Sequence, residues 1–290
     1  MSSIPLQSRL PRTYKIKDIV QETEMVRTYT FDGSLGAKPG QMVMVWLPGV
    51  DEVPMSVAYD DGAVTKITFF AVGDLTKALA EKQVGDLVGL RGPFGTCYEW
   101  KPGEHIVLVA GGYGAAPMYF VATSSVHHGC TLEAIVGARG KEHLLYMKEL
   151  EALPHVSLHV ATNDGSVGYK GFNTEILEKL LSSCPRTSGK AKAGECHPID
   201  RVFACGPEMM LKKVSEITAA HGVPSQLSLE RYMKCGYGLC GNCVMDPWGI
   251  RMCVEGPVVK NEVLLKLEEF GKYHRDDLGR KQLFNPPKSH

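Results

Sequence analysis

The sequence predicts a β-barrel, an α/β domain with a parallel sheet, and a small cysteine-rich region, in that order. Three observations predict this organisation. Short strands bounded by Gly and Pro fill the first ~100 residues, and buried strands alternate with helices beyond them. In addition, four of the nine cysteines fall between residues 235 and 253. We therefore place the domains at residues 1–103, 104–222 and 223–290.

Composition excludes several functional classes. The 290 residues are 44% hydrophobic and 22% charged, which is ordinary for a globular protein, and Lys+Arg equals Asp+Glu at 32 each. This balance gives no electrostatic footprint for nucleic acid. No apolar run approaches the ~20 residues of a membrane span, and the N-terminus lacks the apolar core of a signal peptide. We expect a cytoplasmic protein with no nucleic-acid or membrane partner.

The barrel prediction rests on short apolar segments. One strand begins near Tyr14, and further strands are predicted at residues 42–47, 64–72 and 86–90. A short helical stretch is expected at 75–83, and the RGPFG segment at 91–95 is interpreted first as a turn. Short strands with this spacing are typical of a barrel.

The second domain shows the alternation that a parallel sheet requires. Its predicted strands cover residues 105–110, 132–138, 156–162 and 201–205, and its predicted helices cover 117–128, 173–181 and 208–220. Residues 183–200 are small and polar and are expected to form a surface loop. The tail is predicted to begin with an amphipathic helix, NEVLLKLEEFGKY (261–273).

The clustered cysteines have the spacing C-x4-C-x2-C-x9-C, with ligand candidates Cys235, Cys240, Cys243 and Cys253. The first three have the spacing of plant-type [2Fe–2S] ligation. Interleaved glycines favour this interpretation, because backbone N–H groups must approach the cluster sulfurs along a positive-φ path. A structural zinc site is the alternative, although zinc ribbons usually pair two separate short knuckles.

The remaining cysteines have ordinary structural interpretations. Cys205 ends an apolar strand, and Cys97 and Cys130 stand near turns. Cys184 and Cys196, together with His197, lie in the polar loop, where a metal site is a less favoured alternative to solvated side chains.

Three segments of the α/β domain are candidates for binding a nucleotide. GGYGAAP follows a strand and opens a helix, which is the context of a phosphate-binding turn, although a simple tight turn remains the alternative. ACGPEMM ends the last strand at the same sheet edge. ATNDGSVG could bond a ribose or nicotinamide, or form an ordinary turn. The candidate residues are Gly111, Gly112, Gly114, Ala115, Pro117, Asn163, Asp164, Gly206 and Pro207.

Two barrel segments are candidates for binding a flavin. VPMSVA could lay its backbone and a hydroxyl along an isoalloxazine ring, and VGDLTKAL opens a helix where a diphosphate would be favoured. The candidate residues are Pro54, Met55, Ser56, Phe70, Gly73, Leu75 and Thr76. The predicted fold class is therefore a β-barrel flavin domain plus an α/β parallel-sheet nucleotide-binding domain, with a small C-terminal [2Fe–2S] domain.

Taken in order, these motifs resemble the ferredoxin–NADP reductase superfamily and, within it, the electron-transfer (iron–sulfur flavoprotein) subunits of class 1B dihydroorotate dehydrogenase. The resemblance covers essentially the whole chain. Pro54-Met55-Ser56 matches the R-P-x-S flavin motif, GGYGAAP the nucleotide turn, and ATNDGSVGYKG and CGPEMM the nicotinamide side. SLERYMKCGYGLCGNC and CVEGPV match the cluster region.

The resemblance implies an NAD(H)-dependent oxidoreductase subunit that uses FAD, a [2Fe–2S] cluster and NAD. Electrons would pass between NAD and a partner dihydroorotate dehydrogenase subunit containing FMN, in a heterotetramer serving de novo pyrimidine (UMP) biosynthesis. No side chain of this subunit is expected to be catalytic, because the cofactors carry the chemistry. The loop holding Met245, Pro247, Trp248, Ile250 and Met252 is expected to border the partner, with Trp248 merely covering the cluster as the alternative.

Some alternatives remain open at this point. Val53 replaces the Arg of the flavin motif, which leaves FMN as a possible substitute for FAD. Arg139 and Lys141 follow the second strand of the nucleotide domain and could meet a 2′-phosphate, so NADP stays an alternative to NAD. The runner-up function is a flavin and iron–sulfur NAD(P)H reductase subunit of a sulfhydrogenase or ferredoxin:NADP oxidoreductase complex. A non-catalytic, zinc-bound interaction module is the alternative from another class.

Overall fold

The computed structural model describes residues 10–183 and 198–284. These residues form two compact units. The barrel unit contains residues 10–97, 229–259 and 266–284, and the sheet unit contains residues 98–183, 198–228 and 260–265. The cysteine-rich segment therefore belongs to the same unit as the barrel. The boundaries predicted at residues 103 and 222 stay a prediction.

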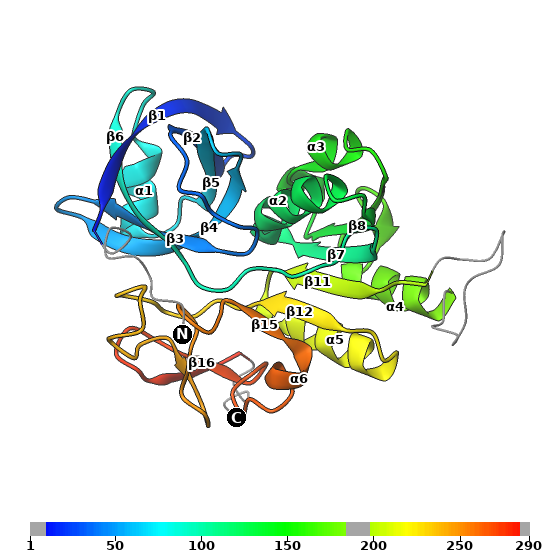
Figure 1. Cartoon of the computed structure of the whole chain (residues 1–290). Coiled ribbons are helices and arrows are strands. Elements are labelled where there is room, and N and C mark those ends of the chain that lie inside the picture. Colours follow the sequence, from blue (N-terminus) through cyan, green and yellow to red (C-terminus); the bar gives the residue numbers. More distant parts are fainter. Residues whose placement is uncertain (1–9, 184–197, 285–290) are drawn as a thin grey trace. The chain divides into compact units, whose positions relative to one another are not determined.

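Six antiparallel strands close the barrel in the order β1-β2-β5-β4-β3-β6 (Figure 1). They are β1 (Arg12–Gln21), β2 (Val26–Asp32), β3 (Met42–Leu47), β4 (Asp51–Asp60), β5 (Val64–Phe70) and β6 (Leu87–Phe94). Helix α1 (Asp74–Ala80) packs against β3 and β4. Side chains that alternate inward, such as Ile16, Tyr29 and Phe31, fill the core.

The barrel differs from the sequence prediction at three strands. The sequence pattern does not predict β2 or β4 as strands, and β4 carries the VPMSVA segment in its middle. The RGPFG interpretation as a turn is wrong for its first four residues. Arg91 to Phe94 continue β6, because Met42 and Met44 of β3 pair with Phe94 and Arg91.

The sheet unit is built on parallel strands in the order β10-β9-β8-β7-β11-β12. They are β10 (Tyr169–Lys170), β9 (Val156–Thr162), β8 (Thr131–Ala138), β7 (His105–Gly111), β11 (Arg201–Cys205) and β12 (Ser225–Ser228). Strands β7 and β11 consist almost entirely of apolar residues, because helices cover both faces of a parallel sheet and bury the side chains on each face.

Helices flank this sheet on both faces, with α2 and α3 on one and α4 and α5 on the other (Figure 1). They are α2 (Ala115–Val126), α3 (Met147–Glu151), α4 (Asn173–Ser183), α5 (Glu208–Ala220) and α6 (Asn261–Leu264), with short 3₁₀ turns η2 (Gly112–Gly114) and η3 (Lys141–His143). Most of the predicted loop at 183–200, including Cys184, Cys196 and His197, lies outside the described residues.

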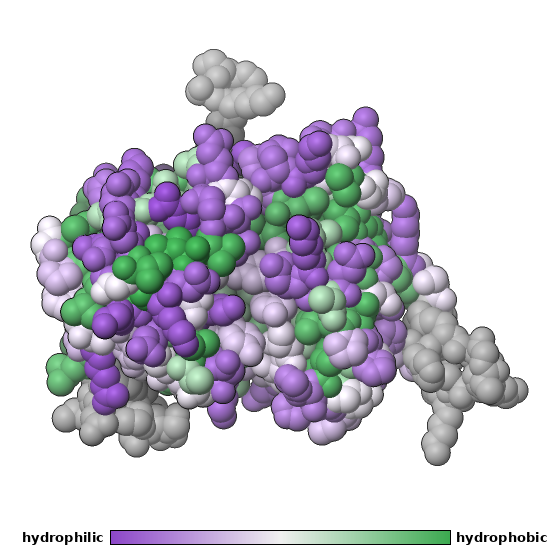
Figure 2. Space-filling model, turned by 90° about the horizontal axis from the view of Figure 1, so that it is seen from above, coloured by the Kyte–Doolittle hydropathy of each residue, from purple (hydrophilic) through white to green (hydrophobic). Residues whose placement is uncertain are grey.

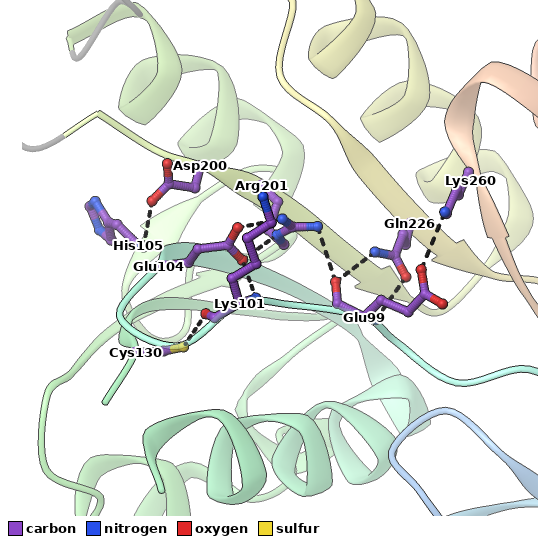
Figure 3. A network of polar contacts seen from close by, with 9 residues as sticks. All are labelled: Glu99, Lys101, Glu104, His105, Cys130, Asp200, Arg201, Gln226 and Lys260. Atoms are coloured by element: carbon purple, nitrogen blue, oxygen red, sulfur yellow. Dashed lines mark hydrogen bonds and ion pairs between the residues drawn. The ribbon is translucent and has the colours of Figure 1, made fainter. Parts of the chain in front are cut away.

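A polar network holds the segment that leads into β7 against the sheet (Figure 3). Arg201 of β11 donates from Nε to Glu104 Oε2 at 2.5 Å, and the Gln226 amide exchanges two hydrogen bonds with the Glu99 backbone. Burial by itself would raise the pKa of Glu104, but the hydrogen bonds from Arg201 and from the Lys101 N–H, together with the charges of these two residues, outweigh burial and lower that pKa. The network therefore fixes where β7 begins.

The C-terminal part contains short elements: β13 (Val244–Met245), β14 (Ile250–Arg251), β15 (Val258–Lys260), β16 (Tyr273–Arg275) and β17 (Lys281–Leu283). The predicted helix at 261–273 is wrong beyond Leu264. Glu269 is fully buried and accepts a hydrogen bond from the Asp246 backbone N–H at 3.0 Å, and Gly271 has φ +73°. A tertiary contact thus overrides the helical pattern of this segment.

One face of the molecule is mostly hydrophilic, with hydrophobic patches separated by polar side chains (Figure 2). Within the described part of the chain, no helix is both long and apolar enough to span a membrane.

Candidate functional site

The four clustered cysteines lie around a short hairpin. Cys243 comes directly before β13 and Cys253 follows β14, and these two strands pair antiparallel. The hairpin brings the Sγ atoms of Cys243 and Cys253 to 3.4 Å, and both side chains are buried. Cys240 is exposed and Cys235 is half-buried. The hairpin thus explains how a nine-residue separation in sequence becomes a close pair of thiols.

Backbone N–H groups point at these sulfurs. The N–H of Gly238 donates to Cys253 Sγ at 3.1 Å, and those of Leu239 and Cys240 donate to Cys235 Sγ at 3.3 and 3.5 Å. The predicted positive-φ path is confirmed, because Gly236, Gly238 and Gly241 have φ values of +75°, +83° and +76°. Such donors stabilise thiolates, which are the form that ligates a metal.

The same contacts change the pKa values of the thiols. Burial alone would raise the pKa of Cys235, but the N–H groups of its loop outweigh burial and lower it to about 7. The hydrogen bond from Cys253 lowers the pKa of Cys243 to about 6. Correspondingly, the bond to Cys243 raises the pKa of Cys253. Because the two thiols are in hydrogen-bond contact, Cys243 and Cys253 titrate together.

This donor set fits a [2Fe–2S] cluster. Cys243 lies beside Cys253, and both the backbone N–H and the side chain of Cys240 hydrogen-bond to Cys235, so the four thiols form two pairs. Two irons with two thiolates each use such an arrangement. Among the residues described, no three His, Cys, Asp or Glu side chains converge on a point that would hold a single metal ion.

The flavin candidates lie on β4, on the end of β5 and on α1, all within the barrel unit. Pro54, Met55 and Ser56 pair with Met44, Val43 and Met42 of β3, and Pro54 and Ser56 are partly exposed. Phe70 is exposed at the end of β5, and Gly73 is exposed before α1. Leu75 is buried, so its side chain packs into the protein.

The hydroxyl of Thr76 is already used locally. Its Oγ1 accepts hydrogen bonds from the backbone N–H groups of Val72 and Gly73 at 3.0 and 2.9 Å. Thr76 therefore caps the first turn of α1, which is seven residues long. A flavin would therefore contact this segment mainly through its backbone and its shape, and less through the Thr76 hydroxyl.

Two nucleotide segments meet at the carboxyl edge of the parallel sheet. Gly111 ends β7 and Gly114 closes η2, while Gly206 follows β11. A Cβ on Gly114 would come within 2.1 Å of the Cys205 carbonyl oxygen, and one on Gly206 within 2.9 Å of Gly111. Only glycine permits this approach, so the GGYGAAP turn and the CGPEMM turn form one surface.

The remaining nucleotide candidates lie at the ends of α2, α5 and β9. Ala115 and Pro117 are buried in the first turn of α2, and Pro207 directly precedes α5. Asn163 and Asp164 follow β9 and are exposed. The hydroxyl and the N–H of Ser166 donate to the Asp164 carboxylate at 2.7 and 2.9 Å and lower its pKa. Asp164 therefore closes a turn, and Asn163 carries the freer polar side chain.

Comparison with known proteins agrees with this geometry. Residues 230–265 match the iron–sulfur cluster binding domain of dihydroorotate dehydrogenase B, and residues 108–216 match the oxidoreductase NAD-binding domain. A curated protein of Methanocaldococcus jannaschii, the probable dihydroorotate dehydrogenase B (NAD(+)) electron transfer subunit, is 40% identical over 93% of this chain and 98% of its own. The corresponding protein of Methanothermobacter thermautotrophicus is 41% identical over 94% and 97%.

The chain belongs to the dihydroorotate dehydrogenase B electron transfer subunit family.

Solved structures show how widely the fold of this electron transfer subunit family occurs. The NADH-dependent reduced ferredoxin-NADP oxidoreductase, studied for flavin-based electron bifurcation, is similar over 92% of this chain and 91% of its own, with a TM-score of 0.75 and 27% identity. The ferredoxin reductase of carbazole 1,9a-dioxygenase has a TM-score of 0.63 at 18% identity, over 77% and 68%. The predicted fold class is confirmed, as is the prediction of an NAD-dependent oxidoreductase subunit using FAD, [2Fe–2S] and NAD.

Sequence reasoning missed one residue at the cluster of this family member. Arg91 of β6 donates from Nη1 to the carbonyl oxygen of Cys235 at 2.6 Å. The only available signal was a charged residue inside the otherwise apolar segment LVGLRGPF. Because Arg91 precedes Cys235 by 144 positions, no local spacing connects the two residues.

Proposed function

We propose that this chain carries electrons between NAD and a dihydroorotate dehydrogenase catalytic subunit during de novo pyrimidine biosynthesis. The single observation that carries the proposal is the hairpin that pairs Cys243 with Cys253, in a segment that the dihydroorotate dehydrogenase B cluster domain matches. The parallel sheet supplies the NAD-binding domain that such a subunit needs.

The residues of this chain act by binding and orienting cofactors. Cys235, Cys240, Cys243 and Cys253 would hold the cluster, and the β4 segment Pro54–Ser56 would face the flavin ring. The glycines at the carboxyl ends of β7 and β11 leave room for the NAD diphosphate to approach the backbone. When bound, the flavin accepts hydride and the cluster carries single electrons, so no side chain must act as an acid or base.

The partner proposed is an FMN-containing catalytic subunit, assembled with this chain as a heterotetramer. The support lies at the exposed side of the cysteine segment. Leu239 is 76% exposed beside the exposed Cys240, and Trp248 at the hairpin tip is 55% exposed. Met245 and Met252 are fully buried, so these two do not belong to the predicted contact surface. Leu239 and Trp248 are the large apolar side chains that this side offers to a partner.

Co-purification followed by cofactor analysis tests the proposal. We expect about one FAD, two irons and two acid-labile sulfides per chain, together with a tightly bound partner that carries FMN. An absorption spectrum with flavin and iron–sulfur bands gives a first answer. Stoichiometric zinc without labile sulfide would overturn the cluster assignment, and a chain that carries FMN in place of FAD would overturn the flavin assignment.

A second candidate function is a reductase subunit in a ferredoxin-linked NAD(P) oxidoreductase complex. The similarity to the NADH-dependent reduced ferredoxin-NADP oxidoreductase favours it. The partner distinguishes the two functions. A co-purified subunit that oxidises dihydroorotate supports the first, whereas one that oxidises reduced ferredoxin supports the second.

A further inference from the structure

The guanidinium group of Arg91 is engaged on every side. Its Nε and Nη2 donate to the two carboxylate oxygens of Glu52 at 2.8 and 2.6 Å, and its Nη1 donates to the Cys235 carbonyl at 2.6 Å. The rings of Phe94 and Tyr237 lie 5.4 and 5.6 Å from the guanidinium carbon. Only 6% of the Arg91 side chain is exposed. A buried, bidentate Arg of this kind is held in one orientation.

This arrangement joins the flavin candidates to the first cluster cysteine. Glu52 lies on β4, two residues before Pro54, and Arg91 lies on β6. The fork toward Glu52 leaves the third nitrogen of the guanidinium facing the Cys235 backbone. The cationic group is therefore closer to Cys235 than its counter-charge is.

Other contacts fasten the same segment to the barrel. A Cβ on Gly236 would come within 2.9 Å of Met44 Cγ, so the residue after Cys235 packs directly on β3. The chain that follows the last cysteine is held by Thr96 of the barrel unit. The Thr96 N–H donates to the Gly256 carbonyl at 2.6 Å, and its hydroxyl donates to the Val258 carbonyl at 2.7 Å. Because both ends of the cysteine segment are held, Arg91 is not needed merely to keep the segment on the barrel.

We propose that Arg91, held by Glu52, is a positioning residue that fixes Cys235 and raises the reduction potential of the cluster. This inference rests on the proposed function, since it requires the four cysteines to hold a [2Fe–2S] cluster. Reduction adds an electron to an anionic centre, so a nearby buried cation favours the reduced form. Glu52 acts in the opposite sense, because its negative charge partly cancels that of Arg91.

Opposite shifts from two substitutions test the proposal. The cluster midpoint potential of the purified holoprotein is measured by a redox titration followed by electron paramagnetic resonance. Arg91→Met should shift the midpoint to a more negative value. Glu52→Gln should shift it to a more positive value, because the cation stays and its counter-charge is removed. A purely structural role for the pair would not produce shifts of opposite sign.

Arg251 and Glu255 provide the matched control. They form an ion pair beside the same segment, and Arg251 Nη1 lies 3.4 Å from the Gly238 carbonyl oxygen, but their side chains are 36% and 42% exposed, against 6% for Arg91. Water screens such a pair, so Arg251→Met should shift the midpoint less than Arg91→Met does. An equal shift would mean that any charge near the cluster acts alike, and would overturn the special role of Arg91.

Arg91→Lys separates charge from position. It keeps a cation but cannot form the bidentate fork, so the midpoint should stay near the wild-type value while a chelator removes iron several-fold faster. If Arg91→Met fails to hold a cluster, Glu52→Gln and Arg91→Lys decide the matter. An unshifted midpoint in Glu52→Gln would overturn the inference. A wild-type chain without iron and labile sulfide would instead overturn the proposed function.

Discussion

At the scale of single residues, Glu133 is a site where the structure makes a definite prediction about pH. It lies on β8 between two histidines of neighbouring strands, with its oxygens 2.6 Å from His159 Nε2 and 3.6 Å from His105 Nε2. Burial by itself would raise the pKa of Glu133, but the two histidines outweigh burial and lower it from 4.5 to about 2.

A lowered carboxylate pKa stabilises the folded state above the unfolded pKa. The contribution of Glu133 is therefore fully present above about pH 4.5 and is lost as the pH falls toward about 2. Glu133→Gln should lower the free energy of unfolding at pH 7 by about 1 kcal/mol, a value reduced for solvent screening of this partly exposed group. The difference from wild type should shrink between pH 4.5 and pH 2 in urea denaturation.

The exposed residue Glu151 supplies the control for this experiment. Glu151→Gln should leave the free energy of unfolding nearly unchanged at every pH. A Glu133→Gln variant that is as stable as wild type at pH 7 would contradict the prediction.

Residue-level features of the site differ in how readily the sequence reveals them. The positive-φ glycines could be predicted because their backbone path depends on short spacings within one segment, and the proposed ligand cysteines were identified from the same spacings. The role of Arg91 could not, since it depends on β6 and the cysteine segment meeting in three dimensions. Likewise, the burial of Met245 at the end of β13 and of Met252 directly after β14 depends on a hairpin that the sequence pattern does not predict.

At the scale of elements, the β13–β14 hairpin carries the prediction about assembly. Trp248 lies at its exposed tip, while Met245 and Met252 anchor its base in the protein. Trp248→Glu should weaken binding of the catalytic subunit at least ten-fold, because a charge would replace a large apolar contact. Diaphorase activity of the isolated subunit should be unchanged. Both are measurable by titration with the partner and by NADH-dependent dye reduction.

The exposed Leu265, which directly follows α6, offers a matched comparison away from the hairpin in sequence. Leu265→Glu adds the same charge and should leave partner affinity unaltered. If Trp248→Glu assembles as tightly as wild type, the hairpin tip is not part of the interface.

Elements were predictable where local pattern and burial agree. The continuous apolar runs of β7 and β11 predicted a buried parallel sheet because helices cover both of its faces. Strand β4 escaped prediction because Pro54 interrupts its apolar pattern and acidic residues stand at both of its ends. The helix predicted at 261–273 ends early because Glu269 is drawn into a buried contact with Asp246.

At the scale of the whole molecule, the two units divide the proposed electron path. The sheet unit carries the NAD-binding domain, whereas the barrel unit carries both the flavin candidates and the cysteine segment. Hydride transfer from NADH to the flavin does not require the cluster. Transfer onward does, because a flavin in one subunit is not expected to lie close to a flavin in another.

Cys240 is the best position at which to separate these two steps. It is the exposed member of the four cysteines, whereas Cys243 and Cys253 are buried and help to close the hairpin. Cys240→Ser should therefore disturb the fold least. Four thiolate bonds to a cluster would nevertheless cross-link residues 235–253 in the cluster-bound protein, so each ligand also contributes to stability. Cys97→Ser changes a cysteine of the same unit outside the cluster and serves as the control.

The expected result for Cys240→Ser is retention of NADH-to-dye reduction together with loss of most NADH-coupled turnover of the partner's substrate. Cys97→Ser should keep both activities. Both are measured on one purified preparation whose flavin content is determined first, because the barrel and the cysteine segment share one unit and flavin loss would abolish both steps for a structural reason. A Cys240→Ser protein that retains its flavin but has lost dye reduction would contradict this division, since hydride transfer would then depend on the cluster.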